Sequence, residues 1–202
     1  MRTPKAAIFD LGRVLLAIDP ARPGFAELMR SLGVKPEEAF SVHWKEPEVV
    51  AHMTGNLSPG DFHQALCRKR RLDMPYPRFV AAWNDLFAPM PGMAEVFAAV
   101  RDRVPVGILS DTDPLHWARA LEVLPWLATV SKPTLSFETG FLKPAPEMYQ
   151  AAARNIGFAA HECVFIDDLP VNVRGAEKAG MTGVVFAGAG DLEGRLRGLG
   201  LV

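Results

Sequence analysis

Polar side chains that could do chemistry follow three short apolar runs of the sequence. Asp10 directly follows the first run, Ser110 and Asp111 follow the second, and the pair Asp167 and Asp168 follows the third. Ligands of open α/β sheets bind outside the carboxyl ends of the strands. If the three runs are strands of one parallel sheet, we expect these carboxylates to lie together at one edge of it.

Carboxylates gathered at one edge repel one another, and a hard cation with oxygen ligands removes that repulsion. The pattern therefore favours a Mg²⁺ site. The alternative is that each aspartate caps the helix or turn after it, and Asp113, which precedes Pro114, is predicted to do so. For Asp10, Asp167 and Asp168 we favour the metal site, because capping does not require carboxylates from separate strands to meet.

The elements that must position these residues alternate along the chain. Apolar runs at residues 6–9, 104–109, 163–166 and 183–186 are typical of buried strands, and helical patterns lie between them at 93–100, 117–124 and 148–156. This alternation predicts an α/β fold, a Rossmann-like parallel sheet with helices on both faces.

Residues 19–88 interrupt the alternation and are predicted to form a helical insertion, because they contain helical pieces separated by proline and glycine and no strand-like run. Ser58 is a predicted N-cap, and the spacing from Phe79 to Phe87 predicts one buried helix face. The basic run at residues 68–71 is interpreted as a solvated helix end, so we expect no nucleic-acid partner.

Composition bounds the class of protein. The chain has 202 residues, of which 49% are hydrophobic, and a net charge of -1, so it resembles a folded protein without a broad field for nucleic acid or anionic lipid. Cys67 and Cys163 are interpreted as reduced thiols. No segment approaches the roughly 18 apolar residues that a membrane span requires, so we expect no membrane partner and a cytoplasmic location.

Four segments, in order, resemble the motifs of the haloacid dehalogenase-like (HAD) hydrolase superfamily. They are residues 9–16 (FDLGRVLL), Leu109-Ser110, residues 142–149 (LKPAPEMY), and residues 165–168 (FIDD) with Asn172 and residues 176–180 (AEKAG). The first two segments look most similar to a branch of sugar-phosphate phosphatases that includes the bacterial α-glucose-1-phosphate phosphatase. The resemblance implies a catalytic core at residues 1–17 and 89–202 and an α-helical cap at 18–88.

The resemblance also implies roles for individual residues in phosphate-ester hydrolysis. Asp10 is the expected nucleophile, which forms an aspartyl phosphate that water hydrolyses. Ser110 is expected to donate a hydrogen bond to the phosphoryl group, and Lys143 to neutralise charge. The expected ligands of Mg²⁺ are the carboxylates of Asp10 and Asp168, the backbone carbonyl of Gly12 and the carboxylate of Asp167.

Gly12 departs from the family's pattern. Phosphatases of the superfamily usually carry there a second aspartate, which protonates the leaving group and activates the water, and glycine has no proton to give. One hypothesis is a substrate with a good leaving group, such as an anomeric sugar phosphate or an acyl phosphate. The other is a proton supplied through water by another side chain, for which the candidates are Asp19, Asp111, Asp113 and His116.

The expected substrate is a small phosphorylated metabolite, with a sugar phosphate favoured. Arg13, Asp111 and His116 are the predicted substrate-binding residues, and His43 and Trp44 of the insertion are further candidates. The alternatives are phosphoryl transfer within the substrate by a phosphomutase, a metal-free haloacid dehalogenase, a phosphonate hydrolase with a cap lysine, and a binding protein that has lost catalysis. The protein is expected to be a monomer or a homodimer.

Overall fold

A five-stranded parallel sheet organises residues 3–202, which are the residues that the computed structural model describes. Its strand order is β5-β4-β1-β6-β7, so β1 lies at the centre between β4 and β6. The strands of this sheet are β1 (Ala6–Phe9), β4 (Val106–Ser110), β5 (Thr134–Leu135), β6 (Cys163–Asp167) and β7 (Thr182–Val185).

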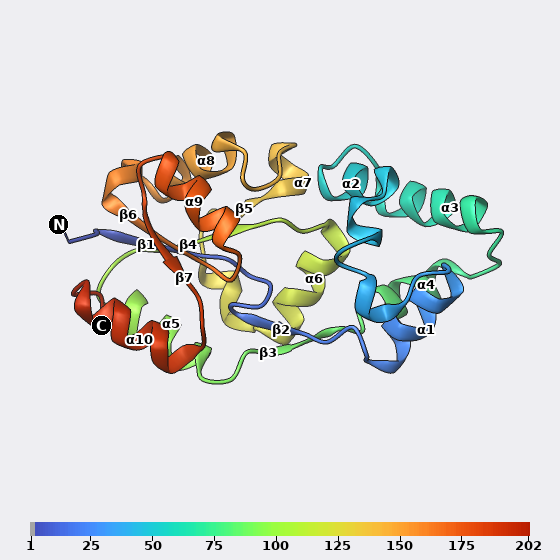
Figure 1. Ribbon diagram of the computed structural model, residues 1–202, viewed down its shortest axis with the longest axis horizontal. Helices are drawn as coiled ribbons and strands as arrows, with labels where there is room; N and C mark the ends of the chain where they lie inside the picture. Colours follow the sequence, from blue (N-terminus) through green and yellow to red (C-terminus); the bar gives the residue numbers. More distant parts are fainter. Residues whose placement is uncertain (1–2) are drawn as a thin grey trace.

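Helices cover both faces of the sheet, as Figure 1 shows. Ala6 and Ile8 of β1 pack in a core with α8 (Pro146–Ile156) and α9 (Pro170–Lys178). The alternate residue Phe9 packs on the other side, with its ring 5.2 Å from that of Phe97. That side is covered by α5 (Met93–Arg101), α6 (Pro114–Val123) and α10 (Ala189–Gly198). The predicted α/β fold class is confirmed.

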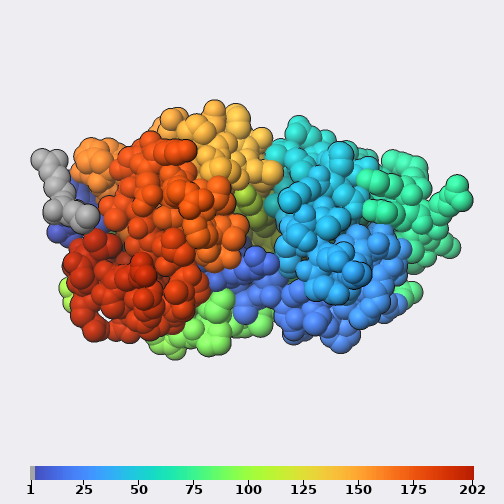
Figure 2. All heavy atoms as spheres, viewed as in Figure 1, coloured from blue at the N-terminus to red at the C-terminus, as the bar shows by residue number. Residues whose placement is uncertain are grey.

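Between β1 and α5 the chain forms a two-stranded antiparallel ribbon and a group of helices. The ribbon pairs β2 (Leu16–Ile18) with β3 (Phe87–Pro89). The helices between its strands are α1 (Pro23–Ser31), α2 (Pro47–Met53), α3 (Pro59–Arg70) and α4 (Tyr76–Trp83). They form one end of the molecule, opposite the end that carries β7 and α10 (Figures 1 and 2). The two-domain division at residues 18 and 88 stays a prediction.

Proline begins many of the helices, because its fixed φ suits the first helical position and its missing N–H has no helical partner there. Helices α1, α2, α3, α6, α8 and α9 all start with proline in this way. The shorter helical turns are α7 (Ser136–Thr139) and the 3₁₀ segments Pro36–Glu38, His43–Lys45, Pro125–Thr129 and Ala160–Glu162. Within residues 3–202, no helix combines the length and the apolarity needed to cross a membrane.

Two details of the predicted insertion are wrong. Residues 19–88 were predicted to lack strands, but Phe87 and Ala88 belong to β3. The predicted helix face from Phe79 to Phe87 ends early, because α4 stops at Trp83; Leu86 is buried beyond its end. The apolar residues from Phe79 to Phe87 are spaced as they are because they pack in one core, not because they lie on one continuous helix. The predicted N-cap is confirmed, since the Ser58 hydroxyl accepts a hydrogen bond from the Asp61 N–H.

Candidate active site

The parallel register of the central strands brings the predicted carboxylates together. Phe9 of β1 pairs with residues of both β4 and β6, so the three strands end at the same edge. Asp10 follows β1, Ser110 is the last residue of β4 and Asp167 is the last residue of β6. All three side chains are buried. The predicted convergence at one edge of the sheet is therefore present.

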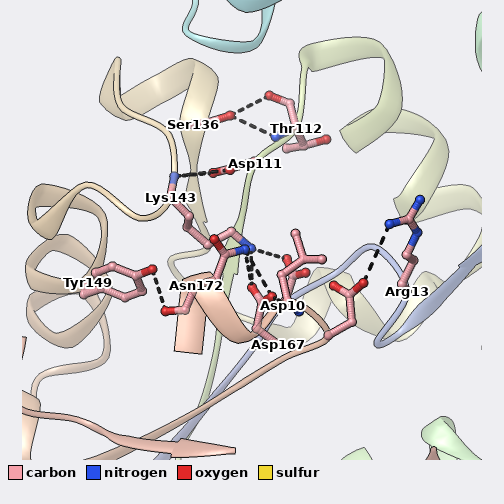
Figure 3. A network of polar contacts seen from close by, with 11 residues as sticks. Asp10, Arg13, Asp111, Thr112, Ser136, Lys143, Tyr149, Asp167 and Asn172 are labelled. Atoms are coloured by element: carbon pink, nitrogen blue, oxygen red, sulfur yellow. Dashed lines mark hydrogen bonds and ion pairs between the residues drawn. The ribbon is translucent and has the colours of Figure 1, made fainter. Parts of the chain in front are cut away.

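Lys143 lies between two of these carboxylates. Its Nζ donates to Asp10 Oδ1 at 2.7 Å and to Asp167 Oδ2 at 2.8 Å, and its side chain is 3% exposed (Figure 3). Burial alone lowers the pKa of a lysine, but the charges of Asp10, Asp167 and Asp111 raise the pKa of Lys143 above its usual range. Lys143 is therefore a fixed positive charge beside Asp10.

Asp10 is under opposing influences. The pKa of Asp10 is raised to about 7, chiefly by burial and also by the neighbouring Asp167, while the Lys143 ammonium acts to lower it. Asp10 is therefore a carboxylate whose charge Lys143 alone does not fully compensate. Additional positive charge near Asp10 would favour its ionised form.

The carboxylates of Asp10, Asp167 and Asp168 fit a hard cation. Each offers an oxygen, and these atoms all lie within 4.8 Å of one another. Burial and the charge of Asp167 raise the pKa of Asp168, although Arg13, with Nη1 3.8 Å from its Oδ2, acts in the opposite direction. An oxygen-only donor set with excess negative charge is the kind that Mg²⁺ prefers. The predicted carbonyl contribution of Gly12 stays a prediction.

A second layer of hydrogen bonds fixes the loop that carries Lys143. The Asp111 carboxylate accepts the backbone N–H of Lys143 at 2.9 and 3.2 Å, so the structure shows Asp111 as a support of this loop (Figure 3). The Ser136 hydroxyl donates to the Thr112 carbonyl at 2.8 Å and accepts the Thr112 N–H at 2.9 Å. The predicted contact of Asp111 with substrate stays a prediction, and Ser136 carries no local signal in the sequence.

Asn172 completes the environment of Asp167. Its side-chain amide donates to both oxygens of Asp167 at 3.1 Å, and the Tyr149 hydroxyl donates to the Asn172 carbonyl at 2.8 Å. Asp167 also accepts the Leu169 N–H at 2.8 Å. Both oxygens of Asp167 are thus engaged with protein donors. Asn172 and Tyr149 lie in segments that carry the family resemblance, but their contacts were not predicted.

A cavity of about 290 Å³ opens at these residues. Its floor includes Asp10, Ser110, Lys143 and Asp168. The part of the chain from β2 to β3 supplies the facing side, which we call the apolar wall and define as Ile18, Phe40, Trp44, Met53, Leu86 and Phe87. The cavity is therefore lined both by the edge of the sheet and by the inserted segment.

His116 is held between the apolar wall and a buried carboxylate. Its Nδ1 lies 3.0 Å from Asp113 Oδ2 and its Nε2 lies 3.0 Å from the Trp83 carbonyl oxygen. Both partners are hydrogen-bond acceptors, so each ring nitrogen of His116 faces a protein acceptor. The predicted contact of His116 with substrate stays a prediction.

Asp113 joins α6 to the inserted helices. It caps α6 through the N–H groups of Leu115 and His116, as predicted, and it also accepts a hydrogen bond from Trp83 Nε1 at 3.1 Å. His52 Nε2 lies 3.5 Å from its Oδ1. Burial acts to raise the pKa of Asp113, but these two histidines hold it well below its usual value.

The Asp113→Asn substitution is therefore expected to lower the free energy of unfolding by about 3 kcal/mol at neutral pH, because it removes one charge of a buried pair. Because the pKa of Asp113 is lower in the folded protein than the 3.8 of an unfolded chain, its ionised form stabilises the fold. This contribution is complete above pH 3.8 and is lost progressively as the pH falls below that value. Urea unfolding of both proteins between pH 7 and pH 3 checks this. Asp102→Asn, at an exposed site, is the control. A difference that grows toward low pH contradicts the assignment.

The family comparison agrees with this geometry. The sequence model described as "haloacid dehalogenase-like hydrolase" matches residues 4–180. The chain belongs to the HAD-like hydrolase family. The match spans β1 to α9 and so contains every residue of the site described above.

Two curated relatives share part or most of this HAD-like hydrolase sequence. "Phosphatase MT3486" of Mycobacterium tuberculosis is 27% identical in an alignment of 190 residues that covers 87% of this chain and 84% of the relative. "Flavin mononucleotide hydrolase 1" of Arabidopsis thaliana is 40% identical over 62 residues, which are 31% of this chain and 25% of the relative. The second match thus covers a quarter of that protein.

Solved structures of other HAD-like proteins have the same fold. The HAD family enzyme bt-2542 of Bacteroides thetaiotaomicron superposes with a TM-score of 0.84 at 24% identity, over 97% of this chain and all of that one. The same enzyme in complex with magnesium and inorganic phosphate gives 0.76 at 22% identity, over 90% and 93% of the two chains. L-2-haloacid dehalogenase of Xanthobacter autotrophicus gives 0.62 at 20% identity, over 88% and 75%.

Proposed function

We propose that this HAD-like hydrolase is a Mg²⁺-dependent phosphatase that hydrolyses a small phosphate monoester through an aspartyl phosphate on Asp10. The observation that carries the proposal is the position of Lys143, whose ammonium bridges Asp10 and Asp167 beside the carboxylate of Asp168. The names of the phosphatase from M. tuberculosis and of the bt-2542 complex with magnesium and phosphate support it.

The chemistry divides into two displacements at phosphorus. Asp10 attacks the phosphoryl group, the bond from its oxygen to phosphorus forms, and the ester bond to the leaving oxygen breaks. Water then attacks the same phosphorus, which releases inorganic phosphate and restores Asp10. Lys143 orients the Asp10 carboxylate and offsets charge on the phosphoryl group, and the Ser110 hydroxyl donates to a phosphoryl oxygen.

Asp10, Asp167 and Asp168, with the carbonyl of Gly12, are the proposed ligands of Mg²⁺. When bound, the ion lowers the repulsion between the carboxylate nucleophile and the phosphate dianion. At a Mg²⁺ concentration 100-fold above its Kd, the free energy of unfolding is expected to rise by about 2.7 kcal/mol. Asp168→Asn is expected to remove most of this gain. Urea unfolding with MgCl₂, against NaCl of the same ionic strength, checks it; equal gains in both proteins contradict the ligand assignment.

Release of inorganic phosphate from a panel of phosphate monoesters, with Mg²⁺ and after chelation, tests the proposed function. We expect release that depends on both Mg²⁺ and Asp10. No release from any compound favours the binding-protein alternative, and an isomerised phosphate ester without free phosphate favours the phosphomutase. Halide release from 2-chloropropionate without metal favours the dehalogenase, a reaction for which the pair Asp167 and Asp168 has no role as metal ligands.

The groups considered as replacements for the acid missing at Gly12 have other partners. Asp111 accepts the Lys143 N–H, Asp113 and His116 bind each other, and Asp19 accepts the Ala21 N–H at 2.9 Å. This supports a substrate whose leaving group departs without a proton from a side chain.

Gly12→Asp is accordingly expected to raise kcat/KM about 10²-fold for an alkyl phosphate and much less for phenyl phosphate, because general acid catalysis helps the poorer leaving group more. A Cβ at Gly12 would lie 2.9 Å from Ile18 Cδ1, so the variant is best combined with Ile18→Val. Gly12→Asn in the same background is the matched control, since it has the same shape and no acidic proton. Equal acceleration of both esters contradicts the leaving-group argument.

The basic run at residues 68–71 gives little support to a nucleic-acid partner. Lys69 Nζ lies 2.8 Å from Glu46 and 2.7 Å from Glu48, and Arg70 lies 2.7 Å from Glu46. These ion pairs engage two of the four basic residues of the run and support the proposal that nucleic acid is not a partner. A monomer or homodimer stays a prediction.

A further inference from the structure

We propose that the substrate of Asp10 is the phosphate monoester of a compact aromatic alcohol or phenol, whose ring lies against the apolar wall. This inference rests on the proposed phosphatase activity and narrows its substrate class. It departs from the sugar phosphate that the sequence favours. Three observations carry it. The cavity has a polar floor and an apolar wall, the polar groups near the wall already contact other protein atoms, and Gly12 stands where an acid would protonate the leaving group.

The residues that line the cavity differ in polarity according to the segment they come from. Within residues 3–202, its charged, hydroxyl and imidazole side chains come from the ends of β1, β4 and β6 and the loops after them, from α6 and from Lys143, where the apolar residues Leu11, Leu142 and Leu169 also line it. All the residues that the segment from β2 to β3 contributes are apolar, and the indole N–H of Trp44 is the one polar side-chain atom among them. The phosphate therefore fits the floor, and the part of the substrate beyond it meets the apolar wall.

The wall is aromatic as well as apolar. The Trp44 ring stacks on the Trp83 ring at 5.3 Å and 9°, and lies 4.6 Å from the Phe40 ring. His116 extends the stack, with its ring 6.1 Å and 10° from that of Trp44. Trp44 and Phe40 are each half-buried, so they retain surface that faces the cavity. A flat ring packs well on such a surface.

Polar groups near the wall are already engaged with the protein. His116 directs both ring nitrogens at Trp83 and Asp113, and the Arg13 guanidinium lies 4.8 Å above the Phe40 ring and 3.8 Å from Asp168. Several sugar hydroxyls placed against this wall would exchange hydrogen bonds with water for apolar contacts, which is unfavourable. An aromatic ring has no such groups to satisfy.

The size of the cavity limits the ring system. A volume of about 290 Å³ is at the small end of ligand pockets, which span roughly 300–1,000 Å³, and it must also hold the phosphate. One ring fits better than a nucleotide. Gly12 supplies no acid to protonate the leaving group. A phenol, with a pKa of about 10, leaves more readily without that proton than an alkyl alcohol does.

The test compares an aromatic and a sugar ester that leave as alcohols of the same class. 2-Phenylethyl phosphate and glucose 6-phosphate are both esters of primary alcohols, so their difference reports the contact with the wall. We expect kcat/KM to be about 10²-fold higher for 2-phenylethyl phosphate. Phenyl phosphate is expected to be faster still. A preference for glucose 6-phosphate overturns the inference and leaves the phosphatase proposal intact, whereas no phosphate from any ester overturns the phosphatase proposal itself.

Variants of the wall connect the preference to named residues. Trp44→Ala is expected to reduce the preference for 2-phenylethyl phosphate over glucose 6-phosphate about tenfold, mainly through a higher KM for the aromatic ester. Ile18→Thr keeps a β-branched residue in β2, adds one hydroxyl to the wall, and is expected to act in the same direction. Val42→Ala, at an exposed site that is 50% accessible, is the control.

Thermal unfolding shows whether each variant is folded. If Trp44→Ala does not fold, the Ile18→Thr comparison still decides the question. Folded variants of Trp44 and Ile18 that keep the full preference for the aromatic ester overturn the assignment of the wall as its binding surface.

Discussion

Asp10→Asn is expected to reduce phosphate release by a factor approaching 10⁶, which is the scale of loss when a hydrolase loses its nucleophile. Asp10 is buried at the carboxyl end of β1 and receives a hydrogen bond from Lys143 at 2.7 Å. The amide is a poor nucleophile and has no negative charge for the ammonium to orient. Assay of inorganic phosphate with Mg²⁺ and a phosphate monoester measures the effect.

The fold is expected to tolerate this change. An asparagine keeps the shape of Asp10 and removes one of several adjacent negative charges. Asp102→Asn, which neutralises an exposed carboxylate beyond α5, is the control for a change of net charge. Mass spectrometry of the acid-quenched enzyme is expected to find a phosphoryl group on Asp10 in the unmodified protein and not in Asp10→Asn. Unchanged phosphate release by Asp10→Asn would exclude the aspartyl phosphate mechanism.

Local sequence patterns were sufficient for the part of the site that depends on strand ends. Asp10, Ser110 and Asp167 each end or follow a continuous apolar run, and parallel pairing carries that order to one edge of the sheet. The fold class follows from the same alternation of runs and helices. The cap of α6 by Asp113 was also predictable, because the partners of an N-cap lie within three residues.

Contacts between distant segments were beyond such patterns. Asp113 contacts Trp83 and His52, which lie on helices at least 30 residues earlier in the chain. No periodicity in the sequence predicts these pairs. The short strands β2, β3 and β5 were also missed. They contain two or three residues each, so their assignment depends on the neighbour with which they pair rather than on a run of their own.

The apolar wall shows the same limit. Ile18 comes from a strand, Trp44 from a 3₁₀ turn and Leu86 from the loop before β3, and each has the hydrophobic character expected of a core residue. The sequence favoured a sugar phosphate through its resemblance to sugar-phosphate phosphatases and through an aromatic residue, Trp44, next to the hydrogen-bonding group of His43. Only the folded arrangement reveals that the inserted segment presents apolar side chains to the cavity while His43 is fully buried.

Lys143→Met is expected to have the second large effect, on stability as well as on activity. Methionine has a similar length and no charge, so Asp10 and Asp167 lose the ammonium that donates to both. Loss of one partner from a buried ion pair costs about 3–5 kcal/mol, because the remaining charges stay buried without compensation. Urea unfolding is expected to show a decrease of this size, and phosphate release is expected to fall at least about 10³-fold.

Two further variants separate these effects. Lys143→Arg keeps the charge but presents a planar, branched group where a compact ammonium is held, so it is expected to recover little activity. Adding Asp167→Asn to Lys143→Met removes one of the uncompensated carboxylates and is expected to restore part of the stability without restoring activity. Lys132→Met, at an exposed lysine on the same stretch of chain, is the control.

The double variant distinguishes an electrostatic role of Lys143 from one in which its side chain only fills space. In that case Lys143→Met would be as stable as the unmodified protein, since methionine packs at least as well as a lysine stem. The Asp167→Asn change would then act additively rather than as a rescue. Either result would mean that the ammonium does not offset the charge of Asp10, and the electrostatic role assigned to Lys143 would have to be abandoned.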